Sequence, residues 1–208
     1  MTTANTEAID SAVSFLVGGF DRNETPYLNR ELSWMAFDAR VLQLARDRHR
    51  PLLERVRFAA IFASNFDEFF QVRVAGLRDQ EAAEFAGRTP DGRTPTEQLT
   101  AIRPIATRLC TELEDLVARD LIPALADEGI AIVSWDQLTD EDHTVLSRTF
   151  EEKILPVLTP LAVDPGHPFP YISDLSLNLA VTLRDPTVGR ELFARLKVPP
   201  NLERFIHL

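Results

Sequence analysis

The sequence has little that could hold a fold together covalently or anchor it in a membrane. It contains a single cysteine, Cys110, which excludes an internal disulfide and a cysteine-rich zinc site. No apolar run approaches the ~20 residues that a membrane-spanning helix needs. The apolar stretch 12–19 lacks the basic leading region of a secretory signal peptide. We therefore expect a cytoplasmic protein with no transmembrane segment.

Self-contained catalytic motifs are also missing. The chain has no G-x-x-x-x-G-K-[ST] loop, no G-x-G-x-x-G turn, no H-E-x-x-H pair and no G-x-S-x-G elbow. Its four histidines lie far apart, which favours surface or loop positions over a shared site: His49, His143, His167 and His207. Cys110 lies in a helical pattern, where packing is a better explanation than nucleophilic chemistry. We expect neither a catalytic residue nor a metal site in these 208 residues.

The charge is strongly acidic overall but unevenly distributed. The formal net charge of −10 argues against a nucleic-acid partner. Between Asp21 and Gln80, however, the chain contains ten arginines and nine acidic residues, so this segment is close to neutral. This is the one region where an anionic ligand would not be repelled, and the arginine fork suits phosphate oxygens. The alternative is that these arginines pair with acids on solvated helix faces.

The first part of the chain has the pattern of a helical bundle. Apolar residues recur with helical spacing over 30–47, with Asn29 as a cap, and again over 52–80. A turn-rich loop at 82–93 leads to Thr94-Pro95-Thr96-Glu97, which has the form of a capping box. The long helix that follows should be kinked or interrupted at Pro104 and end near Gly129.

After this helix the period changes to that of a mixed α/β segment. We predict a short strand at 130–133, a helix capped by Thr139, a β-hairpin from the alternating stretches 175–183 and 192–198, and a further strand beginning at 204–208. The predicted class is α+β, an all-α N-terminal bundle followed by a partial α/β head domain with an antiparallel hairpin. The expected divisions are a disordered or loosely docked leader at 1–23, a helical domain at 24–128 and the head segment at 129–208.

The most informative stretch is F-A-S-N-F-D-E-F-F, which begins at Phe62. Ser64 and Asn65 interrupt an apolar pattern with two residue types that favour helix caps. One interpretation is a local cap at a helix kink. The other is a ligand site, because an amide both donates and accepts hydrogen bonds, and freed N–H groups at a break could face a phosphate. Spacing alone leaves both open.

Four blocks between Tyr27 and Leu77 resemble the start of bacterial polyphosphate kinase, the phosphohistidine type that synthesises long chains. They are Y-L-N-R-E-L-S-W-M-A-F-D-A-R-V-L from Tyr27, P-L-L-E-R from Pro51, I-F-A-S-N-F-D-E-F-F from Ile61 and V-R-V-A-G-L from Val72. The stretches 158–165 and 175–181 are similar to the head domain that follows in this family. The resemblance therefore covers 27–208.

The resemblance implies a longer enzyme that transfers the terminal phosphate of ATP reversibly to inorganic polyphosphate, leaving ADP. Its phosphorylated histidine, partner histidine and magnesium-site residues would lie in C-terminal domains of phospholipase-D-like fold, so the 208 residues alone should be inactive. One ATP-binding residue falls in this chain, Asn65, followed by Phe66 where leucine is commoner. The family also implies homo-oligomer contacts through the head and, for the full-length enzyme, peripheral membrane association as an addition to the cytoplasmic location.

Two other functions stay open. The chain could be a non-catalytic regulatory or assembly module that uses its helical part as a docking surface. It could also bind nucleotide weakly without turnover.

Overall fold

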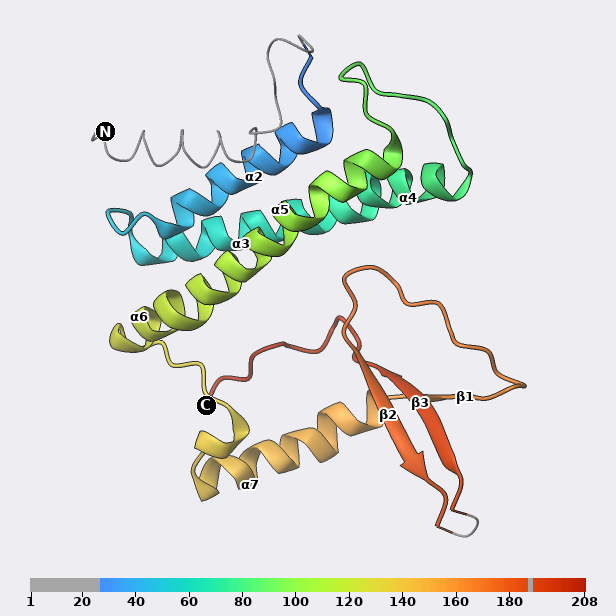
Figure 1. Cartoon of the computed structure of the whole chain (residues 1–208). Helices are drawn as coiled ribbons and strands as arrows, with labels where there is room; N and C mark the ends of the chain where they lie inside the picture. Colours follow the sequence, from blue (N-terminus) through green and yellow to red (C-terminus); the bar gives the residue numbers. More distant parts are fainter. Residues whose placement is uncertain (1–26, 187–188) are drawn as a thin grey trace. The chain divides into compact units, whose positions relative to one another are not determined.

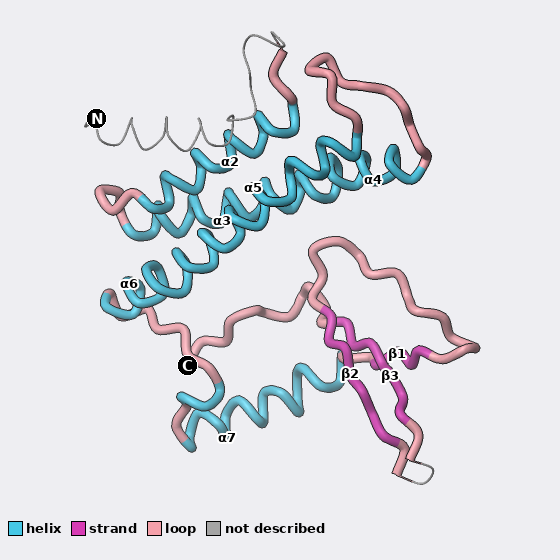
Figure 2. The backbone as a smooth tube through the Cα atoms, viewed as in Figure 1, coloured by secondary structure: helices cyan, strands magenta, loops and turns pink. Residues whose placement is uncertain are grey.

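The computed structural model describes residues 27–186 and 189–208 of the chain (Figure 1). The chain divides into two compact units, Met1–Ile132 and Val133–Leu208, whereas the sequence places the division after Glu128. In the described residues, the first unit is helical and the strands belong to the second (Figure 2). The predicted α+β class is therefore confirmed. The predicted leader at 1–23 lies outside the described residues.

Helix α2 (Arg30–Arg46) begins where the sequence predicts. Oδ1 of Asn29 accepts hydrogen bonds from the N–H groups of Glu31 and Leu32, at 3.0 and 3.1 Å. These bonds satisfy two of the N–H groups that a helix start leaves without a partner. The Asn29 side chain is 1% exposed, and its Nδ2 also donates to Asp91 and Gln98, both at 3.1 Å. One side chain thus caps α2 and ties it to the loop and helix that come much later in the chain.

Helix α3 (Leu52–Glu68) continues without a break into a π-helical stretch, η1 (Phe69–Val74), and then α4 (Ala75–Ala82). The predicted helical range is confirmed, but the predicted kink at Ser64–Asn65 is wrong. The Asn65 carbonyl accepts from the N–H of Phe69, so the main chain stays helical there. The irregularity comes later, where the Ala75 N–H donates to Phe70, five residues back.

A loop then leads to helix α5 (Pro95–Leu116). Its capping box is present as predicted: the Thr94 hydroxyl accepts from the Glu97 N–H at 3.2 Å, and Glu97 accepts from the Thr94 N–H at 2.7 Å. Pro104 lies within α5, and the helix continues through it, so of the predicted kink or interruption the interruption is wrong.

The helix extends through η2 (Val117–Leu121) and α6 (Ile122–Asp127). It ends at Gly129 as predicted, where φ is +83° and the Ile130 N–H donates to the Leu125 carbonyl.

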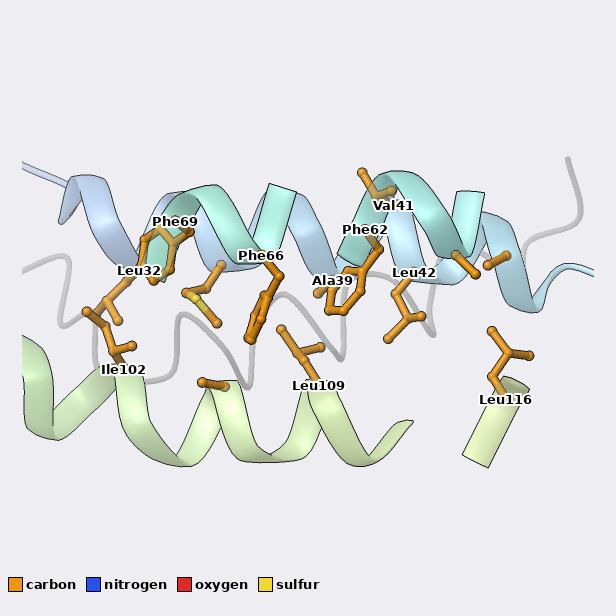
Figure 3. Packing of buried hydrophobic residues seen from close by; sticks show 14 of the residues in the cluster. Leu32, Ala39, Val41, Leu42, Phe62, Phe66, Phe69, Ile102, Leu109 and Leu116 are labelled. Carbon is orange, nitrogen blue, oxygen red and sulfur yellow. The ribbon is translucent and has the colours of Figure 1, made fainter. Parts of the chain in front are cut away.

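The core of the first unit lies between α2, α3 and α5. Figure 3 shows Phe66 of α3 and Leu109 of α5 directed toward one another within it. On α2 the buried apolar residues have the predicted helical spacing, while Trp34 and Phe37 of the same helix are half-exposed. The largest fully buried apolar side chains of the cluster are Phe62, Phe69, Met35, Leu42 and Leu109.

The second unit contains a short 3₁₀ turn, η3 (Trp135–Gln137), and helix α7 (Asp140–Thr149), capped by Thr139 as predicted. A π-helical stretch, η4 (Phe150–Ile154), and a short 3₁₀ turn, η5 (Leu155–Val157), follow α7. Three strands complete the unit: β1 (Pro160–Val163), β2 (Asn178–Arg184) and β3 (Glu191–Lys197).

The sheet is antiparallel in the order β1-β3-β2. The predicted hairpin is confirmed, with Val181 opposite Ala194 in its register. Strand β1 was not predicted, because a four-residue strand that starts on Pro160 carries too little periodicity to detect.

Two predicted strands are absent from the described residues. Residues 130–133 are irregular, and Ile130, Ile132 and Val133 are each nearly half-exposed. Residues 204–208 form turns and irregular chain without a strand partner. In both places the apolar residues gave a local β signal, but a strand forms only where a neighbouring strand supplies the hydrogen bonds.

Candidate functional site

Asn65 lies near the end of α3, half-buried at the seam with α2. Its Nδ2 donates a hydrogen bond to Oδ1 of Asp38 on α2, at 3.1 Å. The side chain therefore caps nothing, and the prediction of a cap at this position is wrong. The helix has no break at Asn65, so it frees no N–H groups there for a phosphate. The amide keeps its second N–H and its Oδ1 for another partner.

Asp38 is a fully buried carboxyl group, 0% exposed. Burial raises its pKa from the ordinary 3.8 to about 6, and the hydrogen bonds from Asn65 and Trp34 offset part of that rise. The group is thus still largely ionised at neutral pH, where a carboxylate can only accept hydrogen bonds.

Sequence reasoning missed Asp38. A detectable signal was its spacing: Asp38 follows Trp34 and Met35 by four and three residues and precedes Val41 and Leu42 by three and four. It therefore lies on an apolar helix face, where a carboxylate is out of pattern.

Two half-exposed aromatic residues of α2 lie close to Asp38 in the sequence. Trp34 and Phe37 precede it by four and one residues, and their ring centroids are 5.9 Å apart. Trp34 is 39% exposed and Phe37 is 48% exposed, so part of each ring is open to solvent. Exposed aromatic faces can stack on a nucleobase. Trp34 and Asn65 both hydrogen-bond Asp38, so an amide with free donor and acceptor positions lies near an aromatic ring, which suits a flat, polar-edged ligand.

The arginines of this region are mostly paired. Arg46 bonds Glu112 at 2.8 Å, and Arg73 lies 3.9 Å from Glu31. Arg55 is 5% exposed and bonds both the Ala45 carbonyl and Asp120, which lowers the pKa of Asp120. These contacts favour the interpretation of paired helix faces over that of a phosphate-binding cluster.

The remaining titratable candidates each have local contacts of their own. His143 packs edge-on against Trp135, and His167 lies beside a cavity of about 420 Å³ with its Nδ1 3.1 Å from Asp164. Burial raises the pKa of the Cys110 thiol, which makes it a poorer nucleophile. Within residues 27–186 and 189–208, no three His, Cys, Asp or Glu side chains gather as a metal site requires.

The comparisons with known proteins agree with the family suggested by the four sequence blocks. Residues 27–133 match the polyphosphate kinase N-terminal domain, and residues 141–208 match the polyphosphate kinase middle domain. The chain belongs to the polyphosphate kinase family. The resemblance stated from the sequence is thereby confirmed.

Several relatives extend this result. The polyphosphate kinase of Mycolicibacterium gilvum is 53% identical over 185 residues, covering 89% of this chain and 25% of the relative. That of Mycobacterium tuberculosis H37Rv is 53% identical over 182 residues, covering 88% of this chain and 24% of the relative. The crystal structure of the Porphyromonas gingivalis polyphosphate kinase superposes with a TM-score of 0.64 at 30% identity, covering 82% of this chain and 25% of the other.

These matches concern only part of each relative. It spans about a quarter of the length of these relatives. No helix in the described part of the chain is long and apolar enough to cross a membrane. The role of Asn65 in ATP binding remains a prediction at this point.

Proposed function

We propose that this chain is the N-terminal part of a polyphosphate kinase that transfers the terminal phosphate of ATP reversibly to inorganic polyphosphate. Asn65 would hold one side of the nucleotide. The observation that supports this role is its half-buried amide, oriented by Asp38 and left with one donor and one acceptor. The half-exposed rings of Trp34 and Phe37 would add apolar surface for a base.

The remaining chemistry would come from elsewhere in the enzyme. The phosphorylated histidine and its partner would lie in the C-terminal domains of the enzyme. Within the described residues, no three His, Cys, Asp or Glu side chains gather as a magnesium site would require. No step through magnesium is therefore assigned to these residues. The enzyme would act in the cytoplasm on ATP and polyphosphate, without nucleic acid, and peripheral membrane association of the full-length enzyme remains part of the proposal.

The second unit would supply contacts between copies of the enzyme. One face of its sheet carries Leu179, Leu183 and Leu192, each 40–50% exposed. The same exposed leucines favour the second candidate function, a non-catalytic assembly module. The two functions differ in whether Asn65 affects the use of ATP.

The test is an Asn65→Ala substitution in the full-length enzyme, assayed by transfer of label from ATP to polyphosphate. We expect kcat/KM for ATP to fall by about 5- to 100-fold, the range for an unsatisfied polar contact. Ser64→Ala is the matched control, because Ser64 is the exposed neighbour on the same helix turn. Unchanged kinetics for Asn65→Ala would leave the assembly module as the better assignment.

The 208 residues assayed alone should transfer no phosphate above background. Turnover that persisted after replacement of His49, His143, His167 and His207 would contradict the phosphohistidine mechanism itself, since no histidine would remain to carry the phosphoryl group.

A further inference from the structure

We propose that Asp38 is a positioning residue for the nucleotide, acting through Asn65: its buried carboxylate sets which end of the Asn65 amide faces the ligand. This inference rests on the proposed function of Asn65. It adds a residue that never touches the nucleotide, on a different helix.

The Asn65 amide has two possible orientations. An asparagine amide can be turned over about its terminal bond, which exchanges Oδ1 and Nδ2. An ionised carboxylate only accepts hydrogen bonds, so only the NH₂ end of Asn65 can face Asp38, as the 3.1 Å contact has it. Oδ1 and the second N–H of Asn65 are then presented in one fixed arrangement. That arrangement matches a base edge that offers an amino donor beside a ring-nitrogen acceptor.

Asp38 cannot act on a ligand directly. It is 0% exposed, enclosed between α2 and its neighbours. Its influence must pass through a side chain that it contacts, either Asn65 on the adjoining helix or Trp34 on α2. Asn65 is the partner with free hydrogen-bonding positions for a base edge, and the double variant separates the two routes.

Folding does not explain the carboxylate. A buried charge that has only neutral donors destabilises a fold relative to an apolar or amide side chain of similar size. The other carboxylates that contact α3 or η1 have a cationic partner: Glu31 of α2 lies 3.9 Å from Arg73 of η1, and Asp120 of η2 lies 2.8 Å from Arg55 of α3. Asp38, by contrast, has the neutral donors Asn65 and Trp34.

The experiment uses the full-length enzyme carrying Asp38→Leu, Asp38→Asn, Asn65→Ala and the double variant Asp38→Leu/Asn65→Ala. We expect Asp38→Leu to raise KM for ATP by about 3- to 10-fold with kcat within about twofold, because a misplaced amide weakens binding and leaves the phosphoryl transfer intact. Asp38→Asn can turn either its Oδ1 or its NH₂ toward Asn65, so it no longer imposes one orientation but can still accept from Nδ2. We therefore expect KM for ATP to rise, by less than in Asp38→Leu, and a KM equal to that of the parent would show that the carboxylate is not what sets the orientation. The double variant should equal Asn65→Ala alone, because the two residues act in series.

Glu31→Gln is the matched control. It lies on α2 seven residues before Asp38, faces the same seam and does not contact Asn65, so KM for ATP should be unchanged. Asp38→Ser is carried in parallel, because the shorter hydroxyl leaves Nδ2 without its partner while avoiding the bulk of leucine. KM for ATP is compared with the parent for whichever of the two variants, Asp38→Leu or Asp38→Ser, melts within a few degrees of it.

The outcomes separate the two proposals. If Asn65→Ala raises KM while Asp38→Leu and Asp38→Ser leave it unchanged, Asp38 has no positioning role and the function of Asn65 stands. If the effects of the two residues multiply in the double variant, Asp38 acts independently of Asn65 and the inference is overturned. If Asn65→Ala itself leaves KM for ATP unchanged, the proposed role of Asn65 is wrong, and the inference about Asp38 is wrong with it.

Discussion

At the scale of the residue, the buried carboxyl of Asp38 makes stability depend on pH. Its pKa in the folded state is about 6, above its ordinary value of 3.8. The folded state therefore binds this proton more tightly than the unfolded chain does. The contribution of the group to the free energy of unfolding is greatest below the ordinary pKa and is lost as pH rises through about 6.

Replacing Asp38 with asparagine removes this titration. We expect Asp38→Asn to raise the free energy of unfolding by ~1–3 kcal/mol at pH ~8, with the gain shrinking toward zero as pH falls to ~4. Urea unfolding followed by circular dichroism at both pH values measures the difference. A gain of equal size at both pH values would show that the carboxyl is not the titrating group.

At Asn65, by contrast, we expect a substitution to lower the free energy of unfolding. If Asn65 were a helix cap, aspartate would replace it with little loss, since both residues cap well. In the structure the substitution Asn65→Asp instead places a second carboxylate against Asp38, where Nδ2 now donates at 3.1 Å. We expect a loss of ~2–4 kcal/mol at neutral pH, from the lost bond and the like charge, with partial recovery below about pH 5 as one carboxyl binds a proton. Thermal melts at the two pH values test this, and Ser64→Asp is the control one residue away.

At the scale of the element, helix ends were predictable because their signals are local. The caps Asn29, Thr94 and Thr139 and the stop at Gly129 each act on residues within five positions along the chain. Strand β1 and the missing strand at 130–133 were not predictable in the same way, since a strand depends on a partner distant in sequence. The Asp38–Asn65 contact joins residues 27 positions apart, so local spacing could point to Asn65 but not to what holds it.

The caps themselves should differ in strength. Thr94→Ala removes a cap at a partly open helix start and should cost ~1 kcal/mol. Asn29→Ala should cost more, ~2–4 kcal/mol, because it also leaves Asp91 and Gln98 without its Nδ2 in a buried setting. Denaturant unfolding of the two variants gives the comparison. Equal losses would mean that the contacts of Asn29 to the later loop and helix contribute nothing beyond the cap.

At the scale of the whole molecule, the two units differ in how much they bury. The first unit has an apolar cluster contributed by α2, α3, η1, α4, α5 and η2. In the described part of the second unit, only Ala194 and Arg195 are buried. Apolar burial is the main favourable contribution to folding, so the free energy that resists local opening should be concentrated in the first unit.

Limited proteolysis of the 208-residue chain should therefore cut the second unit before the first. We expect early cleavage within residues 130–208, where the chain is irregular or weakly buried, and a helical fragment ending near Gly129 that persists. Proteases cut transiently opened chain, so the persistence of a fragment reports its local stability. Mass spectrometry of the fragments over time measures the order. Cleavage at equal rates in the two units would contradict the difference, and early loss of α2 or α3 would contradict the placement of the core between α2, α3 and α5.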